Sequence, residues 1–205
     1  MDYPVELDYG GFMKKLVLIL ALVLVMGGAL FADVDWTSYP SGLGPGHPML
    51  NIGIGIGYNY GWKLKVPPIL ASIDFPVELG GIPFSFGGGF GMAMYGYDYG
   101  NSSSGYTYRY TNMVINGRFA YHPNLGVPNL DVYPILTLGM RLRLYKYEGR
   151  GYYSSGWSDS SGMNGYFDFG AGIGIRYYFS NFFGIYAEAG YTGLTWINAG
   201  LTLKF

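Results

Sequence analysis

The chain has 205 residues, of which half are apolar, with a formal charge of −1, 35 glycines, 22 tyrosines and no cysteine. This length predicts one domain. The near-neutral charge gives no support to nucleic-acid binding, and the missing cysteine excludes disulfides and thiolate sites. After the N-terminal region, no run reaches the roughly 20 consecutive apolar residues of a transmembrane helix.

The N-terminal region has the pattern of a secretory signal peptide. Met13-Lys14-Lys15 is followed by the apolar run LVLILALVLV and a small-residue exit, so residues 13–32 are predicted to be a cleaved signal peptide. Residues 1–12 are acidic and precede this start, and we interpret them as a mis-assigned N-terminal extension. The alternative for the apolar run is an N-terminal membrane anchor.

Cleavage is predicted after Ala32, with Ala29 as the alternative position. Because no cysteine follows either position, a lipoprotein is excluded. Residues 33–46 are rich in Pro, Gly and Ser and are predicted to form a short periplasmic lead-in.

From residue 47 onward, apolar residues alternate with small or polar ones. This period of two is typical of β-strands. We predict eight strands, at about 49–60, 69–77, 84–97, a fourth ending at 121, 132–147, 165–179, 184–191 and 196–205. Turns are expected at 61–68, 78–83 and 180–183, and longer polar loops at 98–105 and 149–164.

The two faces of these strands differ in an unusual way. In the last strand Ile197, Leu201 and Phe205 share one face, while the other face carries Gly200 and Lys204. A glycine-rich face is a poor solvent surface but suits a narrow polar lumen, and the apolar face suits lipid. The sequence therefore predicts an all-β fold, an eight-stranded antiparallel up-and-down transmembrane β-barrel over residues 47–205. The alternative is a soluble periplasmic barrel that binds a lipid, with its apolar face inside.

The stretch GAGIGIRYYFSNFFGIYAEAGY and the ending Leu203-Lys204-Phe205 resemble the family of small bacterial outer-membrane β-barrels of the OmpA/OmpX type. The resemblance covers roughly residue 48 to the end. It implies a location in the outer membrane of a double-membraned bacterium, with outer-membrane lipid around the barrel. It also implies that Phe205, with Leu203, is the signal read by the barrel-assembly machinery, and it specifies no activity.

Eight charged residues are predicted to face the lumen. Charges in a narrow barrel are tolerated when they are paired and hydrogen-bonded. We therefore expect an ion-pair network that plugs the lumen, with Arg143 near Asp168 and Arg176 near Glu188 unless barrel shear displaces them. The alternative is a narrow passive channel for ions or small solutes, with charge separations beyond about 5 Å. The eight residues are Asp74, Arg118, Arg141, Arg143, Asp168, Arg176, Glu188 and Lys204.

Two outer segments, 95–110 and 149–164, are dense in Tyr, Ser and Gly. This composition suits binding surfaces, because Tyr gives amphipathic contact at low entropic cost. We predict a structural or surface-interaction (adhesin-like) role for the barrel. In the second case these segments would bind an extracellular partner; the alternative for them is polar filler with outer-girdle tyrosines. The binding candidates are Tyr106, Tyr108, Tyr152, Tyr153 and Trp157.

Other chemistry finds no support in the sequence. The glycine runs 53–57, 87–91 and 170–174 lie within strands and precede no helix, unlike phosphate-binding loops. A Ser–His–acid hydrolase of the barrel type needs its histidine near the outer rim, but His47 and His122 both fall at the opposite end. We therefore predict no enzyme activity, no metal and no cofactor.

Overall fold

The computed structural model describes residues 34–57, 63–100, 104–150 and 160–205. The chain divides into two units, Met1–Val34 and Asp35–Phe205, and the second is described below. The N-terminal extension and the signal peptide predicted for 1–32 lie outside the described residues. No helix among the described residues is long and apolar enough to cross a membrane, a finding that does not bear on crossing by strands.

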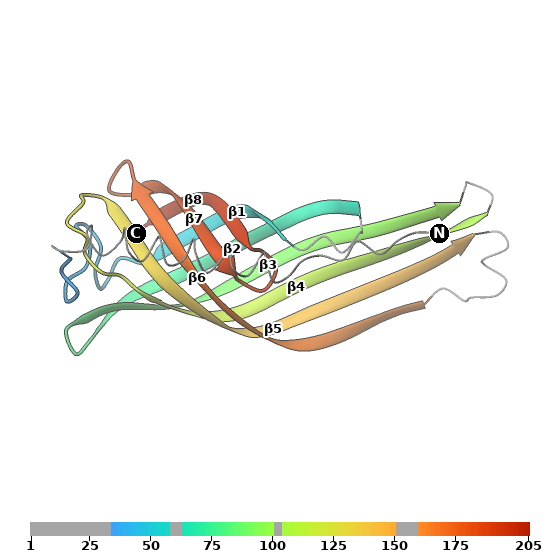
Figure 1. Ribbon diagram of the computed structural model, residues 1–205, viewed down its shortest axis with the longest axis horizontal. Coiled ribbons are helices and arrows are strands. Elements are labelled where there is room, and N and C mark those ends of the chain that lie inside the picture. Colours follow the sequence, from blue (N-terminus) through green and yellow to red (C-terminus); the bar gives the residue numbers. More distant parts are fainter. Residues whose placement is uncertain (1–33, 58–62, 101–103, 151–159) are drawn as a thin grey trace, which may run out of the picture. The chain divides into compact units, whose positions relative to one another are not determined.

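Eight antiparallel strands form a closed barrel in chain order, each pairing with its sequence neighbours, and β1 pairs with β8 (Figure 1). The prediction of an all-β, eight-stranded up-and-down barrel is confirmed. The strands are β1 (Met49–Ile56), β2 (Lys63–Leu79), β3 (Ile82–Gly100), β4 (Gly105–Tyr121), β5 (Leu130–Arg150), β6 (Ser160–Tyr178), β7 (Phe183–Tyr191) and β8 (Ile197–Lys204).

The two ends of the barrel differ. We call the end where β8 stops, and where the β2–β3, β4–β5 and β6–β7 connections lie, the turn end. At the other end β3 to β6, which are 17 to 21 residues long, run on beyond β1, β7 and β8, which are 8 or 9 residues long (Figure 1). Pairing of β6 with β7 begins only at Ala171, and pairing of β1 with β2 stops at Ile69. The outer parts of β2 to β6 therefore form an open sheet, which we call the extension.

Three strand boundaries in the extension differ from the predicted ones. Residues 63–68 of the expected turn belong to β2, where the register shifts around Val66 and no β1 residue pairs with the two prolines. Proline has no backbone N–H to donate to a neighbouring strand, so it is tolerated at such an edge position of the sheet. The two predicted loops are also shorter, because the ladders continue to the pairs Gly100↔Gly105 and Tyr147↔Ser160.

The faces of the strands are as predicted. Ile54, Ile173 and Leu201 on the outside are 63%, 59% and 51% exposed, whereas Arg176 and Thr202 inside have no exposed surface. A barrel with its apolar face inside is therefore wrong for this chain. Rings also gather on the outside at the turn end, where Phe84 and Phe119 lie 4.9 Å apart. This ring belt comprises Phe75, Phe84, Phe86, Phe119, Tyr121, Tyr177, Phe179, Phe182, Phe183 and Phe205.

Candidate functional site

Five buried charged side chains meet inside the lumen. Arg118 Nε donates to Asp74 Oδ1 at 2.9 Å, and Arg118 Nη2 donates to Glu188 Oε1 at 2.6 Å. Arg176 donates to Asp131 Oδ2 at 3.0 Å and also to Asp74. We call Asp74, Arg118, Asp131, Arg176 and Glu188 the lumen cluster. Its members come from five strands, β2, β4, β5, β6 and β7, because each occupies an inward position of the two-residue alternation.

Neutral side chains complete the hydrogen bonding of the cluster. The Tyr133 hydroxyl donates to Glu188 Oε1 at 2.9 Å, and the Arg176 guanidinium carbon lies 4.1 Å from the centroid of the Tyr133 ring. Asn51 accepts from Arg176 Nε at 3.2 Å and donates to Asp74 at 3.3 Å. Gly174 leaves room for the ring, since a Cβ there would lie 2.1 Å from it. Each charge is therefore paired and hydrogen-bonded, which is the condition for burying it.

The partners differ from those predicted. Arg176 and Glu188 do not pair with each other; each instead bonds to a member of another strand. Asp168 pairs with Arg141 at 3.7 Å rather than with Arg143. Both corrections have one cause, because the stagger between strands decides which inward residues meet.

The remaining predicted lumen residues lie outside the cluster. Arg143 Nε donates to Asn112 Oδ1 at 3.2 Å, and its guanidinium carbon lies 5.8 Å from the Tyr110 and Tyr166 rings. Lys204 Nζ donates to the Gly42 carbonyl at 2.8 Å. These two cations lie toward opposite ends of the barrel, so the predicted network is in fact divided.

Sequence reasoning missed Asp131 and Tyr133. The fifth strand was expected to begin at Val132, two residues later than Leu130, which left Asp131 outside the inward row. The alternation itself contains the signal, since Asp131, Tyr133, Ile135 and Thr137 follow at every second position and all are buried.

The connection between β7 and β8 folds into the lumen above the cluster. Leu194 and Thr195 are only 5% and 1% exposed. The Tyr191 hydroxyl donates to Asp168 Oδ1 at 3.0 Å, and Arg141 Nη1 donates to the Gly193 carbonyl at 3.5 Å. Gly193 has φ +93°, and a Cβ there would lie 2.6 Å from Asp168 Oδ2. We call residues 192–195 the outer cap.

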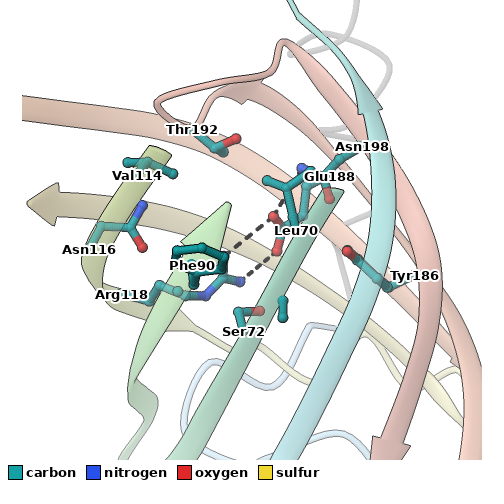
Figure 2. Close-up of a pocket in the computed structure, with 12 residues that line it drawn as sticks. Leu70, Ser72, Phe90, Val114, Asn116, Arg118, Tyr186, Glu188, Thr192 and Asn198 are labelled. Atoms are coloured by element: carbon teal, nitrogen blue, oxygen red, sulfur yellow. Dashed lines mark hydrogen bonds and ion pairs between the residues drawn. The ribbon is translucent and has the colours of Figure 1, made fainter. Parts of the chain in front are cut away.

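A small cavity of about 20 Å³ lies in the lumen beside the cluster and the outer cap (Figure 2). Its polar lining includes Arg118, Glu188, Asn116, Asn198 and Thr192, and the Arg118–Glu188 contacts cross the view in Figure 2. A cavity of this size holds about one water molecule. The space left in this part of the lumen is thus that of a single solvent site.

The lead-in covers the turn end. The Tyr39 hydroxyl bonds to the Val77 and Phe84 carbonyls, and its ring lies 6.1 Å from that of His122. Asp35 forms an antiparallel bridge with Asn124. The predicted lead-in is therefore packed against the β2–β3 and β4–β5 connections.

Beneath it, His122 lies between a serine and an aspartate. Ser85 Oγ and His122 Nε2 are 2.8 Å apart, and His122 Nδ1 is 2.9 Å from Asp131 Oδ1. The expectation that His122 lies far from the extended end holds, but its two neighbours were not foreseen. Ser85, His122 and Asp131 are 1%, 0% and 0% exposed. A nucleophile must reach its substrate, so this chain of contacts joins β3, the β4–β5 connection and β5 rather than forming an open active site. His47 lies exposed ahead of β1.

In the extension, the lumen-facing side of the sheet is covered by tyrosines. The register aligns Tyr97 with Tyr108 and Tyr99 with Tyr106, and Tyr108 pairs with Tyr147. The Tyr99–Tyr106 and Tyr106–Tyr147 ring centroids are 5.3 Å and 5.7 Å apart. We call Tyr97, Tyr99, Tyr106, Tyr108 and Tyr147 the tyrosine face.

The two described binding candidates, Tyr106 and Tyr108, lie on this face. Tyr152, Tyr153 and Trp157 lie outside the described residues. No group of three or more His, Cys, Asp or Glu side chains that could hold a metal ion occurs in the described part of the chain.

The fold and the site together define a small closed β-barrel with an apolar exterior and a filled polar lumen. No family model and no curated protein matches the chain. Two solved structures of Ail, the attachment invasion locus protein of Yersinia pestis, are similar in fold. One, in complex with the heparin analogue sucrose octasulfate, has 15% identity, TM-score 0.46 and covers 78% of this chain and 96% of Ail. The other has 16% identity, TM-score 0.43 and covers 78% and 95%.

Proposed function

We propose that this protein is a non-catalytic outer-membrane barrel with a closed lumen that presents its tyrosine face to an extracellular partner. The observation that carries the proposal is the collection of tyrosines on one side of a sheet that extends beyond the closed barrel. Tyrosine-rich surfaces give broad amphipathic contact with little loss of rotamer freedom.

The membrane location is supported by the outside of the barrel. Outward residues of β1, β6 and β8 such as Ile54, Ile173 and Leu201 are apolar and exposed, and aromatic rings form a belt at the turn end. Lipid solvates apolar side chains, and rings concentrate at membrane interfaces. Phe205 follows β8 and is 57% exposed, which supports the proposal that it is the signal read by the assembly machinery. The signal peptide proposed for residues 13–32 would deliver the chain.

The filled lumen favours a structural barrel over the passive channel. All the lumen charge pairs have nitrogen–oxygen separations of 3.7 Å or less, below the roughly 5 Å expected of an open water column. The outer cap and the lead-in close the lumen on either side of the cluster. In planar bilayers we expect no discrete conductance steps from the pure protein. Reproducible steps that scale with salt concentration would establish the channel instead.

The test of the tyrosine face is binding by the intact protein. Nanodiscs carrying the wild type are expected to bind the surface of cultured epithelial cells, measured by flow cytometry. The triple variant Y97S/Y106S/Y108S should bind at least about 30-fold more weakly, since a central aromatic contact contributes 2 kcal/mol or more. Tyr177→Ser, an outward tyrosine at the turn end, is the matched control. Equal binding by wild type and triple variant would overturn the proposal.

A further inference from the structure

The outside of the extension carries a row of cations that none of the preceding roles explains. Register pairs Lys63 with Gly96, Gly96 with Arg109, and Arg109 with Lys146. Directly opposed residues of antiparallel strands point to the same side, and Arg109 lies two positions along β4 from outward Thr111. The three cations therefore share the outer side of the sheet, opposite the tyrosine face. We call Lys63, Arg109 and Lys146 the basic rim.

The basic rim begins where the apolar exterior ends. The outward positions of β5 are apolar up to Leu144, and the next outward residue is Lys146. In β4, Met113 and Thr111 precede Arg109, and in β2 the outward pair Val66↔Met94 precedes Lys63. On β2 and β5, the first outward residue beyond the apolar band is thus a cation, and on β4 the polar Thr111 lies between that band and Arg109. That is the level at which a bilayer changes from acyl chains to headgroups.

Positive charge exceeds negative charge around the basic rim. Lys65 pairs with Asp98 at 2.8 Å and Lys146 with Glu148 at 2.5 Å. Within the described residues, no ion pair joins a carboxylate to Lys63 or Arg109, and Asp98 is attracted by Arg109 as well as by Lys65. The four cations Lys63, Lys65, Arg109 and Lys146 thus face two carboxylates, Asp98 and Glu148. All these side chains are exposed or half-buried, so the pairs are solvated and can exchange partners at little cost. An anion brought to this level would be attracted by every member of the rim.

We propose that the basic rim binds the phosphate groups of anionic lipid headgroups in the surrounding leaflet. Arg109 supplies a fork of donors suited to phosphate oxygens, and Lys63 and Lys146 act as point charges on flexible stems. The bilayer holds headgroup phosphates at the level of the rim, so the lipid rather than a dissolved anion is the occupant. The inference rests on the proposed membrane location.

The test uses the full chain in phosphatidylcholine vesicles that contain spin-labelled phosphatidic acid or spin-labelled phosphatidylcholine. The relative association constant of the two lipids is read from the motionally restricted signal. At low salt we expect the wild type to prefer phosphatidic acid, and Arg109→Gln to lower this preference about fivefold. K63Q/R109Q/K146Q should abolish it, Arg109→Lys should retain most of it, and high salt should weaken it in the wild type.

Arg143→Gln is the matched control, because it removes one cation from the same strand as Lys146 but from the lumen-facing side. It should leave the lipid preference unchanged. A wild type without preference, or an equal loss in Arg143→Gln, overturns the basic rim while leaving the membrane location intact. Displacement of the labelled lipid by soluble inorganic phosphate would assign the rim to a dissolved anion instead. Failure of every variant to fold into vesicles, seen as unchanged gel mobility on heating, refutes the membrane location itself.

Discussion

Replacing Arg176 with methionine tests what holds the lumen closed. The Arg176 side chain is completely buried and donates to Asp131 and Asp74 while it stacks on Tyr133. Methionine retains the apolar stem but none of the donors. Removing one partner of a buried ion pair costs about 3–5 kcal/mol. Because Asp74 keeps Arg118 and Asp131 keeps His122, we expect a loss near the lower limit, about 3 kcal/mol in the free energy of unfolding.

The assay is urea unfolding of the protein folded in lipid vesicles, followed by heat-modifiable gel mobility. The double variant R176M/D131N should recover about 1–2 kcal/mol of the loss, since it removes a carboxylate that the single variant leaves underpaired. Arg143→Gln, which contacts no carboxylate, should cost less than about 1 kcal/mol. If R176M unfolds at the same urea concentration as the wild type, the lumen cluster does not stabilise the barrel and the reasoning fails.

Two further variants probe close packing and pH dependence. Gly174→Ala should destabilise the barrel by about 1–3 kcal/mol, because its Cβ would lie 2.1 Å from the Tyr133 ring. Adding Tyr133→Leu to this variant should restore part of the lost free energy of unfolding in the urea assay. Hydrogen bonds from the Ser38 hydroxyl and from Thr37 lower the pKa of Asp35 to about 2. Because this pKa is lower in the folded state than the value of about 3.9 in the unfolded state, ionised Asp35 stabilises the fold at pH values above about 3.9. The stabilisation is lost as the pH falls through about 2. The fluorescence of Trp36, as the single tryptophan of a variant, should therefore change between about pH 4 and pH 2, and Asp35→Asn should remove the change. A pH-independent signal from the chain with Asp35 would refute this assignment.

The sequence alone predicts the strand count and the side to which each residue points, because both follow from a period of two. Ile173 and Arg176 illustrate this. They are three positions apart on one strand and so point to opposite sides, with Ile173 outside and Arg176 fully buried inside. The boundaries were less predictable. Tyr, Ser and Gly occur both in loops and in exposed strands, so the composition of 98–105 and 149–164 did not distinguish the extension from a loop.

The pairings within the site could not be predicted for a different reason. Alternation fixes the direction of Glu188 and Arg118 but not the stagger that brings them together from β7 and β4. The outer cap was equally hidden, because the five residues between β7 and β8 carry no pattern that distinguishes an inward fold from an outward one. Asp131 was missed because the start of its strand was predicted two residues too late.

The lumen cluster also bears on why this register is adopted. In lipid, the apolar outer face gains little from one pairing over another as long as the apolar row stays outside, since acyl chains solvate Ile and Leu equally in each such register. A slip of one residue, however, moves every inward side chain outward. It would place Arg118, Arg176 or Glu188 against the apolar exterior. For a basic residue this cost rises from about 0–1 kcal/mol near an interface, where Arg176 lies, to about 2–4 kcal/mol at the midplane. A slip of two residues keeps the faces but separates Arg176 from Asp131, leaving buried charges underpaired. The charges therefore penalise both errors, whereas the apolar exterior penalises only the first.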